Sequence, residues 1–172
     1  MRPSISASTT KAGDTILVLP GTYDKGVSDG YTASAGKCRV YVNVKNLSIR
    51  STGGAAVTHI VGAKTDDETA AGCGDEAVRC IQCYYSKGTE VIGFTLRDGA
   101  SKTFTANGYA GRGGAIHSVP TGETVWLVDS VVSNCASYFG VSDDVGNVRT
   151  LFTNNRVKSS GIARAGLNFA CV

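Results

Sequence analysis

The chain has little proline, little histidine and no long apolar run, and these shortages narrow the possible folds. Three of its 172 residues are proline and 22 are glycine, a balance that suits many turns. No stretch reaches the ~18 consecutive apolar residues of a membrane-spanning helix. No segment longer than a turn or two keeps the 3.6-residue apolar period of a helix. The sequence therefore predicts neither a membrane span nor a helical fold.

The chain also lacks a strong charge bias. Its net charge is +3, and its 17 Lys and Arg residues are scattered, which argues against a nucleic-acid partner. An apolar content of 42% and a length of 172 residues predict one globular domain, 1–172. Residues 1–11 contain no apolar signal-peptide core, so the chain is either cytoplasmic or begins after a removed leader.

What the sequence does contain is a repeated short pattern. A residue that tolerates left-handed backbone is followed three positions later by an apolar residue that would face inward from a strand. The turn residues are Asn46, Gly93, Asp129 and Asn154, and their apolar followers are Ile49, Leu96, Val132 and Val157. The gaps of 47, 36 and 25 residues fit a coil of about 24 residues with one insertion. We therefore expect a β-solenoid in which the four turn residues stack at one corner.

Three polar or glycine-rich segments interrupt this pattern, near 24–36, 65–76 and 101–113, and are predicted to be inserted loops. About six coils would remain, each burying its apolar side only against its neighbours. The first and last coils would expose strand edges that need a cap or a partner. One function to consider is therefore a structural spacer that associates end to end.

Several phrases of the sequence resemble a known family. AGDTILVLPGTY at 12–23 and KNLSIRS at 45–51 resemble the opening coils of the pectin-lyase-like superfamily, and VRCIQC at 78–83 and LVDSVVSNCAS at 127–137 look like later rungs of bacterial β-helix proteins. The resemblance implies an all-β fold, a single-stranded right-handed parallel β-helix. It also implies a secreted or cell-surface location and extends over residues 12 to 160.

Candidate catalytic groups are few. Asp143 and Asp144, with Arg156 beyond them, are the candidates for glycoside hydrolase or polysaccharide lyase chemistry. Adjacent residues of a strand point to opposite faces, which argues against cooperation between the two carboxylates. The Asn-Thr-Asp and Gly-His-Gly motifs of polygalacturonases are missing. His117 follows the apolar Ile116, so we expect it to face outward as an exposed histidine.

Aromatic residues favour a different function. Four that could stack against sugars are the candidate ligand-binding residues: Trp126, Tyr109, Tyr84 and Tyr85. The leading hypothesis is accordingly a non-catalytic module that binds carbohydrate or another surface, with a polysaccharide-active enzyme as the alternative. The acids of the 65–76 loop could hold calcium, although solvated loop acids explain them as well.

Six cysteines leave two alternatives open. Cys80 and Cys83 have the spacing of half a zinc site, but no second pair of ligands follows. One disulfide that involves Cys73, Cys80 or Cys83 could tie down the 65–76 loop. Otherwise the cysteines are buried free thiols that pack as small apolar side chains.

Overall fold

A computed structural model describes residues 10–32, 35–67, 71–103, 110–120, 122 and 124–157. These residues form parallel strands joined by turns and loops, arranged as stacked sheets that are consistent with a parallel β-helix. No helix in these ranges is long and apolar enough to cross a membrane.

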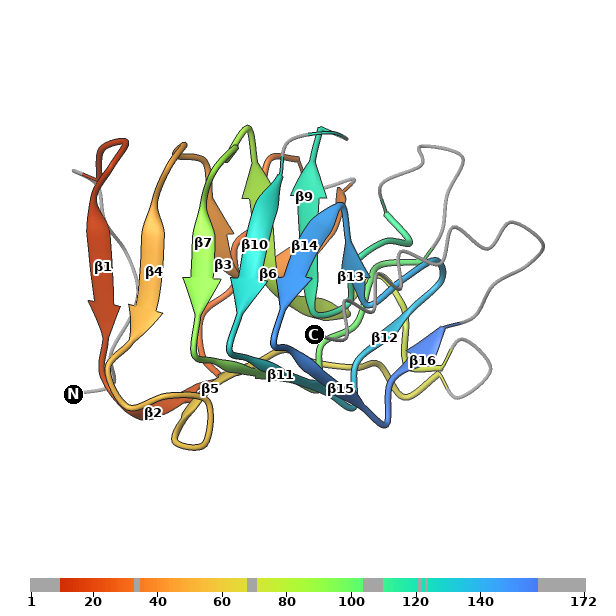
Figure 1. Cartoon of the computed structure of the whole chain (residues 1–172). Helices are drawn as coiled ribbons and strands as arrows, with labels where there is room; N and C mark the ends of the chain where they lie inside the picture. The colour runs from red at the N-terminus through yellow and green to blue at the C-terminus, as the bar shows by residue number, and fades with distance from the viewer. Residues whose placement is uncertain are drawn as a thin grey trace.

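Three larger sheets enclose the core (Figure 1). Sheet A, at the front of Figure 1, contains β1 (Thr15–Val18), β4 (Ser48–Ser51), β7 (Glu90–Ile92), β10 (Val125–Val128) and β14 (Val145–Val148). Sheet B, along the bottom, contains β2 (Gly21–Tyr23), β5 (Thr58–Val61), β8 (Thr95–Arg97), β11 (Val131–Ser133) and β15 (Leu151–Thr153). Sheet C, behind sheet A, contains β3 (Lys37–Val42), β6 (Val78–Tyr84), β9 (Ile116–Val119) and β13 (Ser142–Asp143). A two-stranded sheet pairs β12 (Ala136–Ser137) with β16 (Arg156–Val157).

The chain visits the sheets in turn, so each pass adds one strand to each sheet. Trp126 pairs with Gly146, only 20 residues further on, whereas Glu90 pairs with Trp126, 36 residues away. The shortest pass is thus shorter than the 24 residues expected, and the longer passes carry inserted segments. All three segments predicted as insertions lack a named strand in their described residues.

The core forms because apolar residues in register face inward from every sheet. On sheet A, Ile49 pairs with Val91, which lies beside Leu127, and all three are buried in one cluster. Equivalent rows on sheets B and C join the same cluster: Ile60, Leu96 and Val132, and Val40, Ile81 and Ile116. Burial of each such side chain contributes roughly 1.5–3 kcal/mol, which one pass could not obtain alone.

The four predicted turn residues all adopt left-handed backbone, with φ of 53° at Asn46, 77° at Gly93, 47° at Asp129 and 53° at Asn154. The prediction that they share one corner is wrong. Ile92 pairs with Val128, which places Gly93 beside Asp129.

The other two turn residues lie at different corners. Ser48 pairs with Glu90, so Asn46 lies level with Gly88, and Ser133 pairs with Thr153, so Asn154 lies level with Asn134. Turn residues of the same chemistry occur at several corners of each pass. Their spacing in the sequence alone could therefore not show which corner each one occupies. The shifted alignment also explains why Val157, predicted to face inward, is exposed.

Candidate functional site

The outer face of sheet C carries a row of polar side chains in register. Tyr41 pairs with Gln82, Gln82 with His117, and His117 with Asp143. The neighbouring residues Ile81 and Ile116 belong to the core, so strand alternation directs this row outward. Gln82 and His117 are nevertheless fully buried.

Two of the inserted segments cover the row. Ser28, in the 24–36 segment, makes an antiparallel bridge to Cys38 of β3. Arg79, also fully buried, donates from Nε to the carbonyl of Arg112 at 2.9 Å and from Nη1 and Nη2 to the carbonyls of Ala35 and Ala110 at 2.6 Å. Burial lowers the Arg79 pKa to about 10, so the guanidinium stays charged near neutral pH. Arg79 therefore ties both segments to sheet C.

The prediction that His117 is exposed is wrong because the 101–113 segment packs against it. A Cβ on Gly113 would lie 2.5 Å from the His117 Cβ. Burial lowers the His117 pKa well below its usual value, and the positive charges of Arg79 and Arg112 lower it further. His117 is therefore a neutral imidazole near neutral pH.

Asp143 is the last residue of the row and lies beside a histidine and an arginine. Its Oδ2 lies 3.6 Å from His117 Nε2 and 3.4 Å from Arg112 Nη1. Burial raises the Asp143 pKa, while Arg112 opposes that shift. A histidine and a carboxylate this close can exchange protons, but a covered histidine is poorly placed to reach a polymeric substrate.

The three candidate catalytic residues are not brought together. Asp144 has left-handed backbone, with φ of 54°, and its Oδ2 is buried without a hydrogen-bond partner among the described residues. Arg156 is exposed on β16, where it pairs with Ala136 in the two-stranded sheet rather than with sheet C. Asp143 is thus the one candidate that lies in the buried row.

The predicted ligand-binding aromatics occupy two places. Tyr84 stacks on Tyr31 with ring centroids 4.7 Å apart, and Tyr85 meets Tyr84 edge-on at 4.6 Å. Sequence reasoning missed Tyr31, whose only signal was its position in the 24–36 insertion that follows the first pass. Tyr109 lies outside the described residues.

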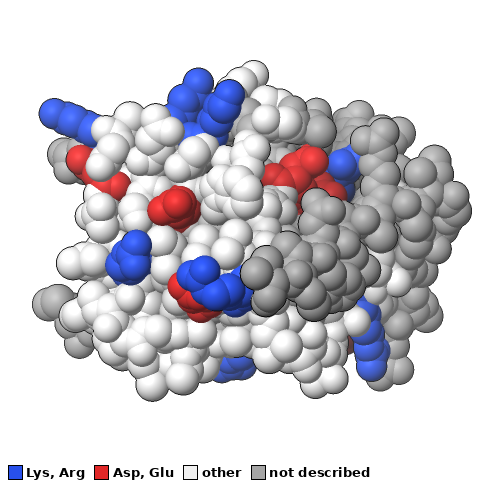
Figure 2. Space-filling model, viewed as in Figure 1, with Lys and Arg blue, Asp and Glu red and all other residues white. Residues whose placement is uncertain are grey.

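Trp126, the chain's single tryptophan, is on the outer face of sheet A and is 40% exposed. Its ring lies over Gly146 of the next strand, where an added Cβ would come within 2.5 Å of the indole. The exposed Glu90 is its partner on the other side. On the face of the molecule that carries sheet A, charged side chains form small separate groups with uncharged surface between them (Figure 2).

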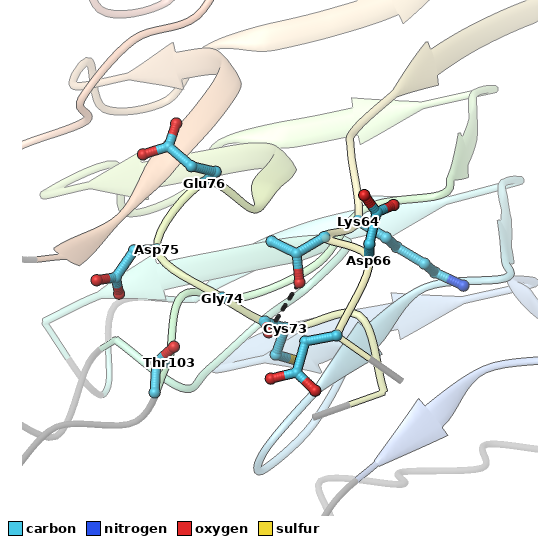
Figure 3. Close-up of a pocket in the computed structure, with 9 residues that line it drawn as sticks. Lys64, Asp66, Cys73, Gly74, Asp75, Glu76 and Thr103 are labelled. Carbon is cyan, nitrogen blue, oxygen red and sulfur yellow. Dashed lines mark hydrogen bonds between the residues drawn. The ribbon is translucent and has the colours of Figure 1, made fainter. Parts of the chain in front are cut away.

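The acidic segment 65–76 lines an open pocket of about 600 Å³ (Figure 3). The labelled carboxylates of Asp66, Asp75 and Glu76 point in different directions. Glu76 forms an ion pair with Lys37, and Asp75 lies 4.0 Å from Lys102. Within the described ranges, no three His, Cys, Asp or Glu side chains converge as a metal site requires. Calcium binding at this loop stays a prediction.

Five of the six cysteines lie in the described residues, and all five are buried free thiols: Cys38, Cys73, Cys80, Cys83 and Cys135. Cys73 is held by the hydroxyl of Ser101, which donates to its sulfur at 3.5 Å. Of the two alternatives left open by the sequence, a disulfide that involves Cys73, Cys80 or Cys83 and buried free thiols, the structure has the free thiols.

Fold and site together define an all-β protein of stacked parallel sheets with one covered polar face and one open face. No protein-family model matches the chain, and searches of curated proteins and of solved structures gave no match either.

Proposed function

We propose that this chain is a non-catalytic, carbohydrate-binding module of a secreted or cell-surface protein, built as a right-handed parallel β-helix of about six coils of the pectin-lyase-like kind. Trp126 is the observation that carries the proposal. It is a large aromatic side chain that remains 40% exposed on the outer face of sheet A, although its strand neighbours Val125 and Leu127 are fully buried.

The surroundings of Trp126 suit a sugar ring. Gly146 has no side chain, so the indole lies against the backbone of the next strand, which holds the ring in place. The apolar C–H face of a pyranose can pack on such a ring. Glu90 and Ser48, in register on the next two strands, supply hydrogen-bonding groups for hydroxyls. Arg50, exposed on the same face, adds a cationic donor that would favour an acidic sugar.

The enzyme alternative has less support. Glycoside hydrolysis needs two carboxyl groups that flank an accessible bond. Asp143 is engaged by Arg112 and His117 beneath an inserted segment, and Arg156 belongs to another sheet. The end-to-end spacer remains a further alternative, because β1 exposes Leu17 and is an edge of sheet A.

A glycan array with the purified chain tests the proposal. We expect binding to a defined set of oligosaccharides and at least a tenfold loss in Trp126→Ala. Leu17→Ala is the matched control, because it removes an exposed apolar side chain from the same sheet, three strands away. Equal binding by Trp126→Ala and the parent chain would refute the sheet A site. Turnover of a polysaccharide that disappears in Asp143→Asn would instead establish the enzyme.

A further inference from the structure

Three polar side chains from three successive passes converge at one corner of sheet B. Asp98 and Asn134 directly follow β8 and β11, and both have left-handed backbone, with φ of 58° and 50°. Asn134 Nδ2 donates a hydrogen bond to Asp98 Oδ1 at 2.6 Å. Lys64 follows β5, and its Nζ donates to Asn134 Oδ1 at 2.8 Å. The carboxamide of Asn134 is therefore held between an amine and a carboxylate.

Neighbouring residues hold the amine and the carboxylate in place. A Cβ on Gly72 would lie 2.9 Å from Cβ and 3.1 Å from Cγ and Cδ of Lys64, so the missing side chain of Gly72 leaves room for the lysine stem. The Lys64 amine points away from Glu76 (Figure 3). Arg97 Nη1 donates to Asp98 Oδ2, and Oδ1 of the same carboxylate accepts from the carboxamide.

We propose that Lys64 and Asn134 form an intramolecular isopeptide bond and that Asp98 carries the proton. In the reaction, the neutral Lys64 amine attacks Asn134 Cγ, an Nζ–Cγ amide bond forms and the Cγ–Nδ2 bond breaks. The proton that Nζ gives up leaves with Nδ2 as ammonia, so the reaction needs no oxidant and no other reactant. This inference does not depend on carbohydrate binding.

The contacts suit this reaction. A C=O bond is about 1.2 Å long, so the lysine Nζ lies within about 4 Å of Asn134 Cγ. Well-oriented groups of one molecule react as if their concentration were about 10⁵–10⁸ M, which offsets the low reactivity of a carboxamide. Both nitrogens are bonded to Cγ in the tetrahedral intermediate. The Asp98 carboxylate beside Nδ2 can therefore take a proton from Nζ and return it to Nδ2.

The bond would join passes that are not neighbours. Strand β8 lies between β5 and β11 in sheet B, so the link from Lys64 to Asn134 encloses the pass that carries Asp98. Each pass of a solenoid is stabilised by contacts with its neighbours only. A covalent link across three passes would therefore prevent the stack from opening one pass at a time.

Mass spectrometry of the full chain tests the proposal. The purified chain is incubated at pH 7 and at pH 9, then reduced, alkylated and digested with trypsin. Lysine amines are mostly protonated at neutral pH, so the bond should form faster at pH 9. We expect the chain to lose the mass of one ammonia. Peptide 51–79, uncut at the modified Lys64, should be joined to peptide 113–149 through Asn134.

Three variants separate the roles of the residues. Lys64→Arg keeps the positive charge but has no attacking amine, so the joined peptide should be absent. Lys45→Arg alters an exposed lysine elsewhere and is the matched control, in which the joined peptide should persist. Asp98→Asn removes the proton carrier and should slow bond formation by about 100-fold or more.

Thermal unfolding provides a second measurement. The two linked residues are 70 positions apart, and a cross-link that closes a loop of this size predicts a melting temperature about 10 °C higher for the joined chain. That difference should vanish in Lys64→Arg and persist in Lys45→Arg. Complete cleavage after Lys64 following prolonged incubation at pH 9 would overturn the proposal. So would a branch at any other pair of residues, or an unchanged rate in Asp98→Asn.

Discussion

The outer faces of sheets A and C are built from the same alternation of side chains and yet have opposite environments. On sheet C, the row that contains Gln82 and His117 is sealed by two inserted segments. On sheet A, the row that contains Glu90 and Trp126 is open to solvent. Alternation along a strand therefore decides whether a side chain faces the core, but the loops decide whether an outward side chain is exposed.

The largest expected effect on stability concerns the buried charge that holds the two inserted segments, 24–36 and 101–113, against sheet C. Arg79→Met should lower the free energy of unfolding by about 3–5 kcal/mol, because three buried carbonyls lose their charged donor. Urea denaturation measures this. Arg50→Met, on the open face, should change stability by no more than about 0.5 kcal/mol. Equal losses of stability in the two variants would contradict the conclusion that the outer face of sheet C is covered and that of sheet A is open.

Substitution of a glycine in the 101–113 segment should have a smaller effect on stability, and a second glycine with left-handed backbone provides a matched control. Gly113→Ala should destabilise the protein by about 2–4 kcal/mol, because Gly113 has left-handed backbone, with φ of 56°, and an added Cβ would lie only 2.5 Å from the His117 Cβ. Gly13→Ala has left-handed backbone, with φ of 89°, but meets nothing within 4 Å, so it should cost about 1 kcal/mol. Denaturation midpoints of the two variants give the comparison. A loss for Gly113→Ala no greater than that for Gly13→Ala would show that the segment does not pack on the histidine.

The smallest expected effect is a dependence of the free energy of unfolding on pH. His117 is held neutral by burial and by Arg79 and Arg112, so its folded-state pKa lies well below its unfolded value of about 6.5. Above pH 6.5 both states are neutral and the histidine adds no slope. Below it, only the unfolded chain gains the proton, so the free energy of unfolding should fall by about 1.4 kcal/mol per pH unit.

Asp143 changes the free energy of unfolding in the opposite direction as the pH falls. Its raised pKa means that the folded state takes up its proton at a higher pH than the unfolded chain does, which favours the folded state on acidification. Urea unfolding at pH 6.5 and 5.5 in the parent chain and in His117→Asn separates the two groups. His117→Asn should remove the fall in the free energy of unfolding between pH 6.5 and pH 5.5. An unchanged slope in His117→Asn would mean that the buried histidine does not control this pH response.

The spacing and chemistry of the turn residues predicted a β-solenoid and left-handed backbone at Asn46, Gly93, Asp129 and Asn154, and the family resemblance predicted that the strands are parallel. They could not assign those residues to corners, because each pass has several corners with the same turn chemistry. The described residues of the three predicted insertions carry no named strand, but what those segments cover could not be predicted. Arg79 is buried by contacts with residues far away in the sequence, which the local pattern of β6 does not predict. His117 is covered by Gly113, only four residues before it, because the 101–113 segment folds back over β9, and strand alternation does not predict that fold-back.

Because Trp126 is the single tryptophan, its fluorescence reports directly on the proposed binding face. The most direct test titrates the chain with an oligosaccharide that it binds on the array and measures both emission and quenching by iodide. We predict a saturable change in emission and protection of the indole from iodide at the same sugar concentrations. Binding shown by calorimetry with no change in Trp126 emission or quenching would contradict it.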